Sequence, residues 1–456
     1  TYPYAARILQ VEKMGKVDFS NSIVSYFVLF AGLGISTYAI REGAGVRDNK
    51  KKLEIFSNEM FSINVFSSIL ALVLLVITVI FVPKLHRYSL LILVQSITIF
   101  GNLIGVTWLY TIMEDYAYIT IRALIVHVLA LILLFVFVHN QSDYVFYAAT
   151  TVVANTGANF FNFFHARKYV NLRVTTQINW SKHIKPIFVI FASTVTTTIY
   201  VNSDKTLLGF LSDEYHVGLY SVSVNIYTVL KSLIAAVILV ALPRLSNYVA
   251  NNRKRDFEKT ATYIFQTFML ILVPLMVGTF MIAPDIITII GGKSYAEAGL
   301  SLQILSLSLF FSMLATFYSN AVLLPFKQEA IVLKATVVSA ILNIVLNLFL
   351  LRFFQQNGAA FTTLLAEATM CIFQYFYVRK YLKFKLSFSY IISIFVGCIS
   401  IIFVVIICDI YIKGFVLNLG VKVFVSIILY FLSLFLLKND VMMNILCMLR
   451  DKKKSL

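Results

Sequence analysis

Long apolar runs separated by short polar stretches recur along the whole chain. About 20 apolar residues, each rising 1.5 Å in a helix, match the thickness of a bilayer core. Short strands of alternating hydrophobicity, typical of a membrane β-barrel, are absent from the pattern. It predicts an all-α polytopic membrane protein with thirteen spans, at about 20–39, 57–81, 89–111, 117–138, 144–164, 186–210, 216–242, 260–283, 299–324, 330–351, 358–378, 389–412 and 417–437.

The opening segment TYPYAARIL (1–9) resembles the end of one further span. Because the chain begins with Thr1 rather than Met, we expect the N-terminal half of the first helix to be missing. The parent protein would then have fourteen spans.

Composition supports a membrane protein and argues against an enzyme. The chain is 60% hydrophobic and 13% charged, with a mean hydropathy of +0.86, whereas a soluble domain is about half apolar and a quarter charged. The largest outer loop, 284–298, is too short for a catalytic domain. The four cysteines form no CxxC pair and the six histidines are scattered, so we predict no metal site and no cofactor.

The net charge of +17 follows the expected membrane topology. With the missing start of the chain placed in the cytoplasm, 27 Lys and Arg lie in the inner segments 41–56, 112–122, 165–185, 244–259, 326–334, 379–387 and 438–456. Nine lie in the outer segments 1–18, 82–88, 139–143, 211–215, 284–298, 352–357 and 413–422. This asymmetry is the one that the positive-inside rule describes, and the basic segments would also attract anionic lipids. It accounts for the charge without nucleic acid, and it predicts that both termini are cytoplasmic.

A weak internal repeat divides the chain. At an offset of 203 residues, Gly15 matches Gly218, Ser20 matches Ser223 and Arg41 matches Arg244, and the basic triplet 50–52 matches 253–255. Duplication is typical of transporters, whose substrate path lies between the halves. We expect an N-lobe at 1–165, a basic cytoplasmic linker at 166–185, a C-lobe at 186–380, and two extra helices with a basic tail at 381–456.

Several spans carry polar residues at helical spacing. One interpretation is that they bond neighbouring helices together. The other, which the presence of such stripes in both lobes favours, is a shared water-filled cavity. The amide side chains expected to line it are Gln95, Asn102, Asn155, Asn159, Asn225, Asn343 and Asn347.

Charged residues inside the spans are costly, at about 2.5–3.5 kcal/mol each near the bilayer centre, and so indicate partners or function. Lys231 and Glu367 lie near the middle of their spans, and Asp204 and Lys205 lie near the outer end of theirs. Glu367 and Asp204 are candidates for ion coupling, and static pairing or hydrogen bonding is the alternative for both. The cations expected to line a path for an anionic head group are Arg7, Arg41, Arg122, Lys205, Lys231 and Arg244, although the arginines lie near span ends where interfacial anchoring is the default.

Six stretches resemble one known family. They are PYAARIL (3–9), SIVSYFVLFAGLGISTYAIREGA (22–44), DKTLLGFLSDEYHVGLYS (204–221), LPRLSNY (242–248), APDIITIIGGKSYAEAGLSLQILSLSL (283–309) and NGAAFTTLLAE (357–367). In this order they resemble the O-antigen and capsule flippases, the polysaccharide transporter family of the multidrug/oligosaccharidyl-lipid/polysaccharide exporter superfamily. Of the candidate lysines Lys205 and Lys231, only Lys205, next to Asp204, sits in a stretch matched to the family pattern, and Lys231 is assigned from this sequence alone.

The resemblance implies a MATE-like fold, with two pseudo-symmetric six-helix lobes around a central cavity and two extra C-terminal helices. It implies a non-enzymatic flippase of the bacterial inner membrane that moves undecaprenyl-pyrophosphate-linked oligosaccharides by alternating access. The implied partners are this lipid, the surrounding membrane lipids, and a polymerase and chain-length regulator.

Two alternatives remain. A drug exporter of the same superfamily would be expected to carry acidic groups for cationic substrates, whereas the candidate path residues here are mostly cationic. An O-antigen polymerase or ligase would need a large outer loop with catalytic residues.

Overall fold

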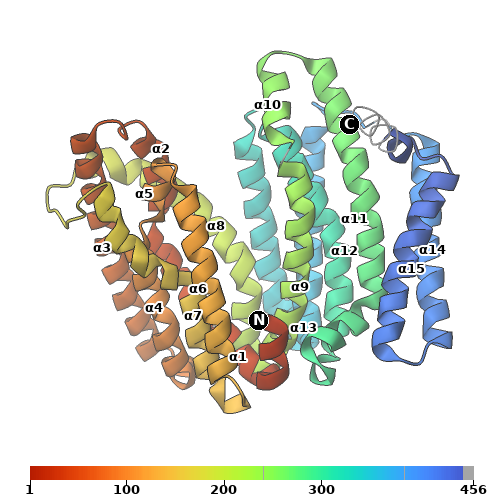
Figure 1. Ribbon diagram of the computed structural model, residues 1–456, viewed down its shortest axis with the longest axis horizontal. Coiled ribbons are helices and arrows are strands. Elements are labelled where there is room, and N and C mark those ends of the chain that lie inside the picture. Colours follow the sequence, from red (N-terminus) through yellow and green to blue (C-terminus); the bar gives the residue numbers. More distant parts are fainter. Residues whose placement is uncertain (240, 385, 445–456) are drawn as a thin grey trace. The chain divides into compact units, whose positions relative to one another are not determined.

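The computed structural model describes residues 1–239, 241–384 and 386–444, and the described chain is helical without strands (Figure 1). It divides into two compact units, Thr1–Gly218 and Leu219–Leu456. The predicted all-helical class is confirmed. The end of the predicted basic tail, 445–456, lies outside the described residues.

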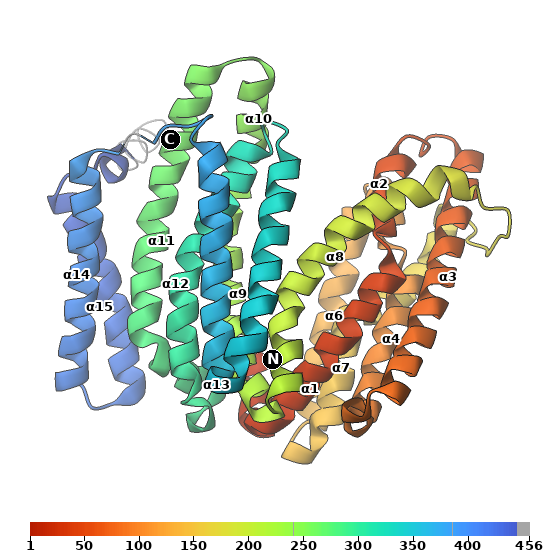
Figure 2. The same ribbon diagram turned by 180° about the vertical axis from the view of Figure 1, so that it is seen from behind.

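Unit 1 is built from one long N-terminal helix and the helices that pack around it. Helix α1 contacts α3, α4, α7 and α8, and Figure 2 shows α1 running beside α8. The helices of this unit are α1 (Tyr2–Gly32), α2 (Ile35–Ala44), α3 (Lys50–Phe81), α4 (Ser89–Gly105), α5 (Thr107–Ile112), α6 (Tyr116–Phe137), α7 (Tyr144–His165) and α8 (Trp180–Leu211).

Unit 2 packs α12 against both α11 and α13, and the last two helices form a pair that lies against α11. Figure 1 shows this last pair at one side of the unit, as expected for two extra helices. Its helices are α9 (Glu214–Leu239, whose first turn belongs to unit 1), α10 (Leu242–Ala250), α11 (Lys254–Gly291), α12 (Ala298–Phe317), α13 (Glu329–Val378), α14 (Phe388–Tyr411) and α15 (Phe415–Leu436).

The described residues contain 11 helices long and apolar enough to cross a membrane. Helix α13 counts once although it covers two predicted spans, because its two arms join through a break at Gln355 (φ 46°). Helix α7 lies where a span was predicted but is not among the eleven. The predicted multi-pass architecture is therefore confirmed.

Two predicted spans are broken where hydropathy gave no sign. The span at 20–39 is divided between α1 and α2 by Leu33 and Gly34, which both adopt left-handed backbone conformations. The span at 89–111 breaks at Val106, which is also left-handed. Hydropathy records which residues are apolar, not their backbone angles, so it runs through such breaks.

The loops predicted to share a side of the membrane come together within each unit. In unit 1, Arg47 pairs with Glu114 at 2.6 Å, and the hydroxyl of Tyr169 donates to Asp115 at 2.6 Å. In unit 2, the ring of Phe326 lies 5.1 Å from Phe257 and 4.4 Å from Tyr381. These residues all belong to segments predicted to be cytoplasmic.

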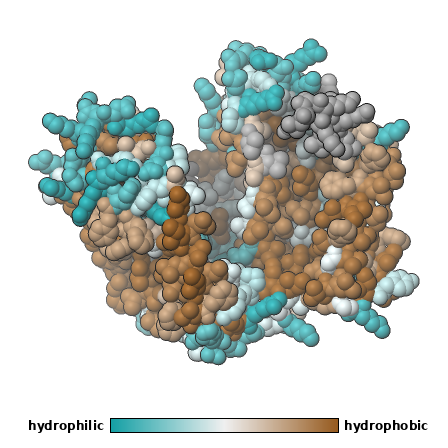
Figure 3. All heavy atoms as spheres, in the orientation of Figure 1, coloured by the Kyte–Doolittle hydropathy of each residue, from teal (hydrophilic) through white to brown (hydrophobic). Residues whose placement is uncertain are grey.

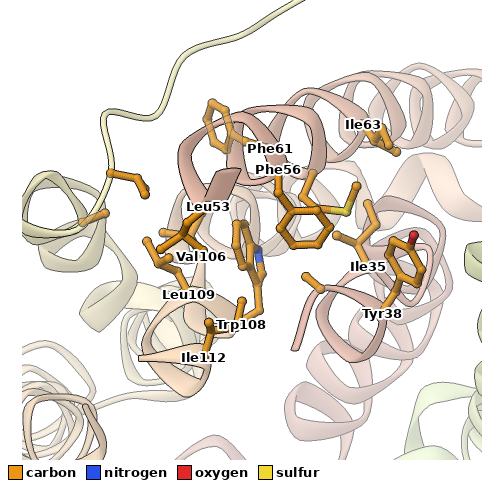
Figure 4. Close-up of a cluster of buried hydrophobic side chains, with 14 of the residues drawn as sticks. Ile35, Tyr38, Leu53, Phe56, Phe61, Ile63, Val106, Trp108, Leu109 and Ile112 are labelled. Atoms are coloured by element: carbon orange, nitrogen blue, oxygen red, sulfur yellow. The ribbon is translucent and has the colours of Figure 1, made fainter. Parts of the chain in front are cut away.

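The apolar core of unit 1 includes a cluster where α2, α3 and α5 meet (Figure 4). Leu53, Phe56 and Trp108 are buried at its centre. Each fully buried side chain of this kind contributes about 1.5–3 kcal/mol relative to leaving it in water. The cluster fixes the short helix α2 against α3, which holds the connecting loop between them.

The repeat-related glycines meet each other. A Cβ placed on Gly15 would lie 1.7 Å from the carbonyl oxygen of Glu214, and one on Gly218 would lie 2.2 Å from the carbonyl oxygen of Val11. Helices α1 and α9 therefore cross with their backbones in contact at the two positions that the repeat matched. Each of the two crossing helices is followed by a short helix and then a long one: α1 by α2 and α3, and α9 by α10 and α11.

Division by compactness places α8 in unit 1, whereas the expected C-lobe began at residue 186. The lobes at 1–165 and 186–380 follow from the internal repeat and not from compactness. They stay a prediction.

Candidate functional site

A buried ion pair of unit 2 joins two charges that the sequence analysis identified separately. The ammonium of Lys231 on α9 lies 3.1 Å from Oε1 of Glu367 on α13. The same oxygen accepts hydrogen bonds from the hydroxyls of Tyr227, at 3.2 Å, and Ser312, at 2.9 Å. Glu367 is 1% exposed, whereas the Lys231 side chain is 31% exposed, so the ammonium is the open end of the pair.

This cluster follows from helical spacing. Tyr227 and Lys231 are four residues apart on α9, and so are Ser308 and Ser312 on α12. Residues four apart lie on one face of a helix. Two polar faces therefore converge on the carboxylate from α13, which explains how a charge is held inside an apolar bundle.

The second carboxylate oxygen is different. Within the described part of the chain, Oε2 of Glu367 is buried without a hydrogen-bond partner, and so is the hydroxyl of Ser308. A buried acceptor without a hydrogen-bond partner costs free energy, about 1–3 kcal/mol. The arrangement therefore leaves Oε2 able to accept one further hydrogen bond, beside the three donors at Oε1.

In unit 1, Lys205 on α8 lies 3.9 Å from Asp18 on α1. Next to it, the hydroxyl of Thr206 donates to Ser22 at 2.9 Å and lies 3.2 Å from the hydroxyl of Tyr26. Asp204 is 5% exposed. The predicted charges 204 and 205 therefore form part of a polar seam between α1 and α8.

The comparisons with known proteins agree with this architecture. Residues 1–249, more than half of the chain, match the family model described as polysaccharide biosynthesis protein. The chain belongs to the polysaccharide biosynthesis protein family.

Two relatives illustrate the family. A protein of Escherichia coli K12 named "Putative O-antigen transporter" is 25% identical over 404 residues, which cover 83% of this chain and 92% of that protein. The capsular polysaccharide biosynthesis protein CapF of Staphylococcus aureus is 22% identical over 383 residues, covering 81% and 91%.

Among solved structures, the lipid II flippase MurJ in an inward closed conformation matches with a TM-score of 0.77 at 16% identity, covering 96% of this chain and 95% of MurJ. This likeness concerns the fold. The predicted class, a polytopic membrane transporter of polysaccharide biosynthesis, is confirmed.

Three other predicted site residues join helices within unit 1 of this family member. Arg122 on α6 is 8% exposed, donates to the carbonyl of Ala158 on α7 at 2.6 Å, and lies over the ring of Tyr118. The amide of Gln95 donates to the carbonyl of Val17 at 3.0 Å. Asn159 is buried against Gly105. These contacts are what helix-to-helix bonding predicts, and whether the residues also line a path stays a prediction.

Asn343 and Asn347 join the two arms of α13. The side-chain amide of Asn347 donates to Asn343 at 3.1 Å, and the hydroxyl of Thr362 on the second arm donates to Asn347 at 2.7 Å. The hydroxyl of Ser339 donates to the carbonyl of Ala366 at 2.6 Å. The two arms are thus an antiparallel pair held by buried polar groups.

The other predicted residues lie nearer the surface. Arg41 pairs with Glu42 at 3.0 Å, and the guanidinium of Arg244 donates to the hydroxyl of Tyr248 at 2.9 Å. Asn225 is half-buried. The remaining residues of the set, exposed in this structure, are Arg7, Asn102 and Asn155.

Sequence reasoning missed one buried cation. Lys422 on α15 is 3% exposed, and its ammonium lies 2.6 Å from both Asp285 on α11 and Asp409 on α14. Lys422 is counted in the outer segment 413–422, although it also lies inside the predicted span 417–437. An aspartate near each neighbouring span end was the available signal, but no pattern paired them.

Proposed function

We propose that this protein flips undecaprenyl-pyrophosphate-linked oligosaccharide repeat units from the cytoplasmic to the outer leaflet of the bacterial inner membrane, for O-antigen or capsular polysaccharide assembly. Family membership and the names of the two relatives support the process. The Lys231–Glu367 pair carries the mechanism, because it provides a half-exposed cation inside an otherwise apolar bundle.

In this proposal the lipid pyrophosphate competes with Glu367 for the ammonium of Lys231. An anion near mid-membrane gains more from a cation than it would in water, because the low dielectric strengthens the attraction. The competition with Glu367 keeps binding weak enough for release. The predicted cations Arg7, Arg41, Arg122, Lys205 and Arg244 would supply further positive potential along the path.

Alternating access then requires the site to change faces. Protonation of Glu367, at the oxygen that has no partner within the described chain, would free Lys231 for the pyrophosphate. Loss of the proton on the opposite face would restore the pair and release the lipid. Asp204 is the second candidate for coupling. The polymerase and chain-length regulator are the expected recipients of the released unit.

The decisive experiment compares three variants in a flippase-null strain, scored by surface polysaccharide. We expect Lys231→Ala to abolish surface glycan and Lys231→Arg to retain part of it. Lys231→Ala also strands the Glu367 carboxylate, which costs about 3–5 kcal/mol for a buried pair. The double variant Lys231→Ala/Glu367→Gln removes that stranded charge.

Because Glu367→Gln also removes the proposed coupling carboxylate, a double variant that stays inactive although its thermal stability in detergent recovers supports a role of the Lys231–Glu367 pair in transport beyond stability. Restored transport in the double variant would show that Lys231 serves only as the structural partner of Glu367. Lys413→Ala, at an exposed lysine, is the matched control and should transport normally.

Orientation is tested separately. Asp48→Cys and Asn251→Cys lie in exposed segments proposed to be cytoplasmic, and Ser294→Cys lies in an exposed segment proposed to be outside. In intact cells, a membrane-impermeant thiol reagent should label only the cysteine at 294. The reverse labelling pattern would invert the direction of flipping. The native cysteines 371, 398 and 408 are buried.

A further inference from the structure

Unit 2 contains a polar cavity apart from the Lys231 cluster. It measures about 920 Å³ and lies between α10, the first turns of α11, the segment before α14 and the residue Asn444. Four cations line it: Arg244, Arg255, Lys259 and Lys383. The cavity is therefore assembled from three basic segments that are far apart in the sequence, all of them proposed to be cytoplasmic.

The charges of the cavity are not balanced from within. Two carboxylates, Asp256 and Glu258, face the four cations. Asp256 is already paired with Arg253, which does not line the cavity, at 2.7 Å. Most of the positive charge thus remains available to a ligand.

The walls also suit a group at the membrane surface. Tyr248 and Tyr263 line the cavity, and the guanidinium of Arg244 lies 5.6 Å from the ring centre of Tyr248. Tyrosines are enriched at the level of lipid head groups. Figure 3 shows hydrophilic atoms gathered over α10 and the start of α11, next to the apolar surface of the helices that continue from them.

We propose that this cavity binds the anionic, phosphate-bearing head group of a membrane lipid. Clustered lysines and arginines next to an apolar helical surface are the groups that bind anionic lipids, at about 1 kcal/mol per cation. Two sources share this chemistry: a bulk anionic phospholipid, and a lipid-linked diphosphate waiting in the inner leaflet. The site goes beyond the proposed function, because it shares only Arg244 with the proposed transport path and does not include Lys231.

The test measures lipid affinity of the full chain by native mass spectrometry from detergent. The variant is Arg255→Gln/Lys383→Gln. The control is Lys51→Gln/Lys52→Gln, which removes two exposed charges from another predicted cytoplasmic segment. The probes are phosphatidylglycerol, phosphatidylcholine, undecaprenyl diphosphate and inorganic diphosphate.

Two removed cations should weaken binding of an anionic lipid about 25-fold, at about fivefold each. A loss for phosphatidylglycerol identifies the bulk phospholipid as the ligand, and a loss confined to undecaprenyl diphosphate identifies the transported class of lipid. Phosphatidylcholine binding should not change. Equal affinities in the variant and the control, or a loss seen only for inorganic diphosphate, would overturn the proposal. Unchanged melting temperatures will show that both variants are folded.

Discussion

The crossing of α1 and α9 should not tolerate a single methyl group. In Gly15→Ala, the new Cβ would lie 1.7 Å from the carbonyl oxygen of Glu214, and contacts under 3.0 Å are essentially never observed. The two backbones would have to separate by about 1.3 Å. The obstacle is backbone and not a flexible side chain, so it cannot rotate away.

The expected cost is at the upper end of the range for overpacking, about 3 kcal/mol. Unfolding entropy is about 2.1 cal/mol/K per residue. Over the residues Thr1–Gly218 of unit 1, this cost lowers the melting temperature by roughly 6–7 °C. Thermal unfolding of the purified protein in detergent, followed by intrinsic fluorescence, measures the shift.

Gly32→Ala provides the control on the same helix. A Cβ on Gly32 meets nothing within 4 Å, so the variant should stay within about 1 kcal/mol of wild type and gain slightly from helix propensity. Equal melting temperatures for Gly15→Ala and Gly32→Ala would refute the close crossing. A large decrease in melting temperature in both variants would show that the effect comes from replacing a glycine and not from the contact.

Two further predictions concern charges at helix ends. Lys422→Met should destabilise the protein by about 2 kcal/mol, which is less than the roughly 3–5 kcal/mol lost when a fully buried pair is broken, because Asp409 is 56% exposed. Lys413→Met is the control, and equal melting temperatures for the two variants would show that the Lys422 ion pairs do not stabilise the protein. The hydroxyl of Tyr169 lowers the pKa of Asp115 below its ordinary value of 3.8, so the stabilising effect is present above that value and is lost as the pH falls through the lowered pKa. Tyr169→Phe should remove this part of the acid dependence in melting curves between pH 6 and 3, and identical curves for wild type and variant would contradict it.

The sequence predicted the helices far better than the contacts between their charges. Hydropathy located α6 and α14 to within one residue at each end, because burial in lipid requires continuous apolar runs. It gave no sign of the left-handed turn at Leu33, because an apolar side chain is equally apolar at any φ.

The site residues show the same division. Lys231 and Glu367 were both identified from their depth in a span, yet they were given separate roles. They are 136 residues apart, and only the packing of α9 and α13 around α12 brings them together. Asp18 was missed because residues 1–18 were assigned to an outer loop, whereas the structure continues α1 through them.

The buried polar contacts between the two arms of α13 have a consequence for how the protein is made. Asn347 and Thr362 are buried and satisfy each other across the two arms. A first arm released alone into lipid would carry unsatisfied amides, and each costs free energy in a solvent that offers no hydrogen bonds. The break at Gln355 is the only separation between the arms. The arms should therefore leave the insertion machinery as one hairpin. Replacing one of these polar residues by an apolar one would then first appear as a defect in membrane insertion rather than in transport.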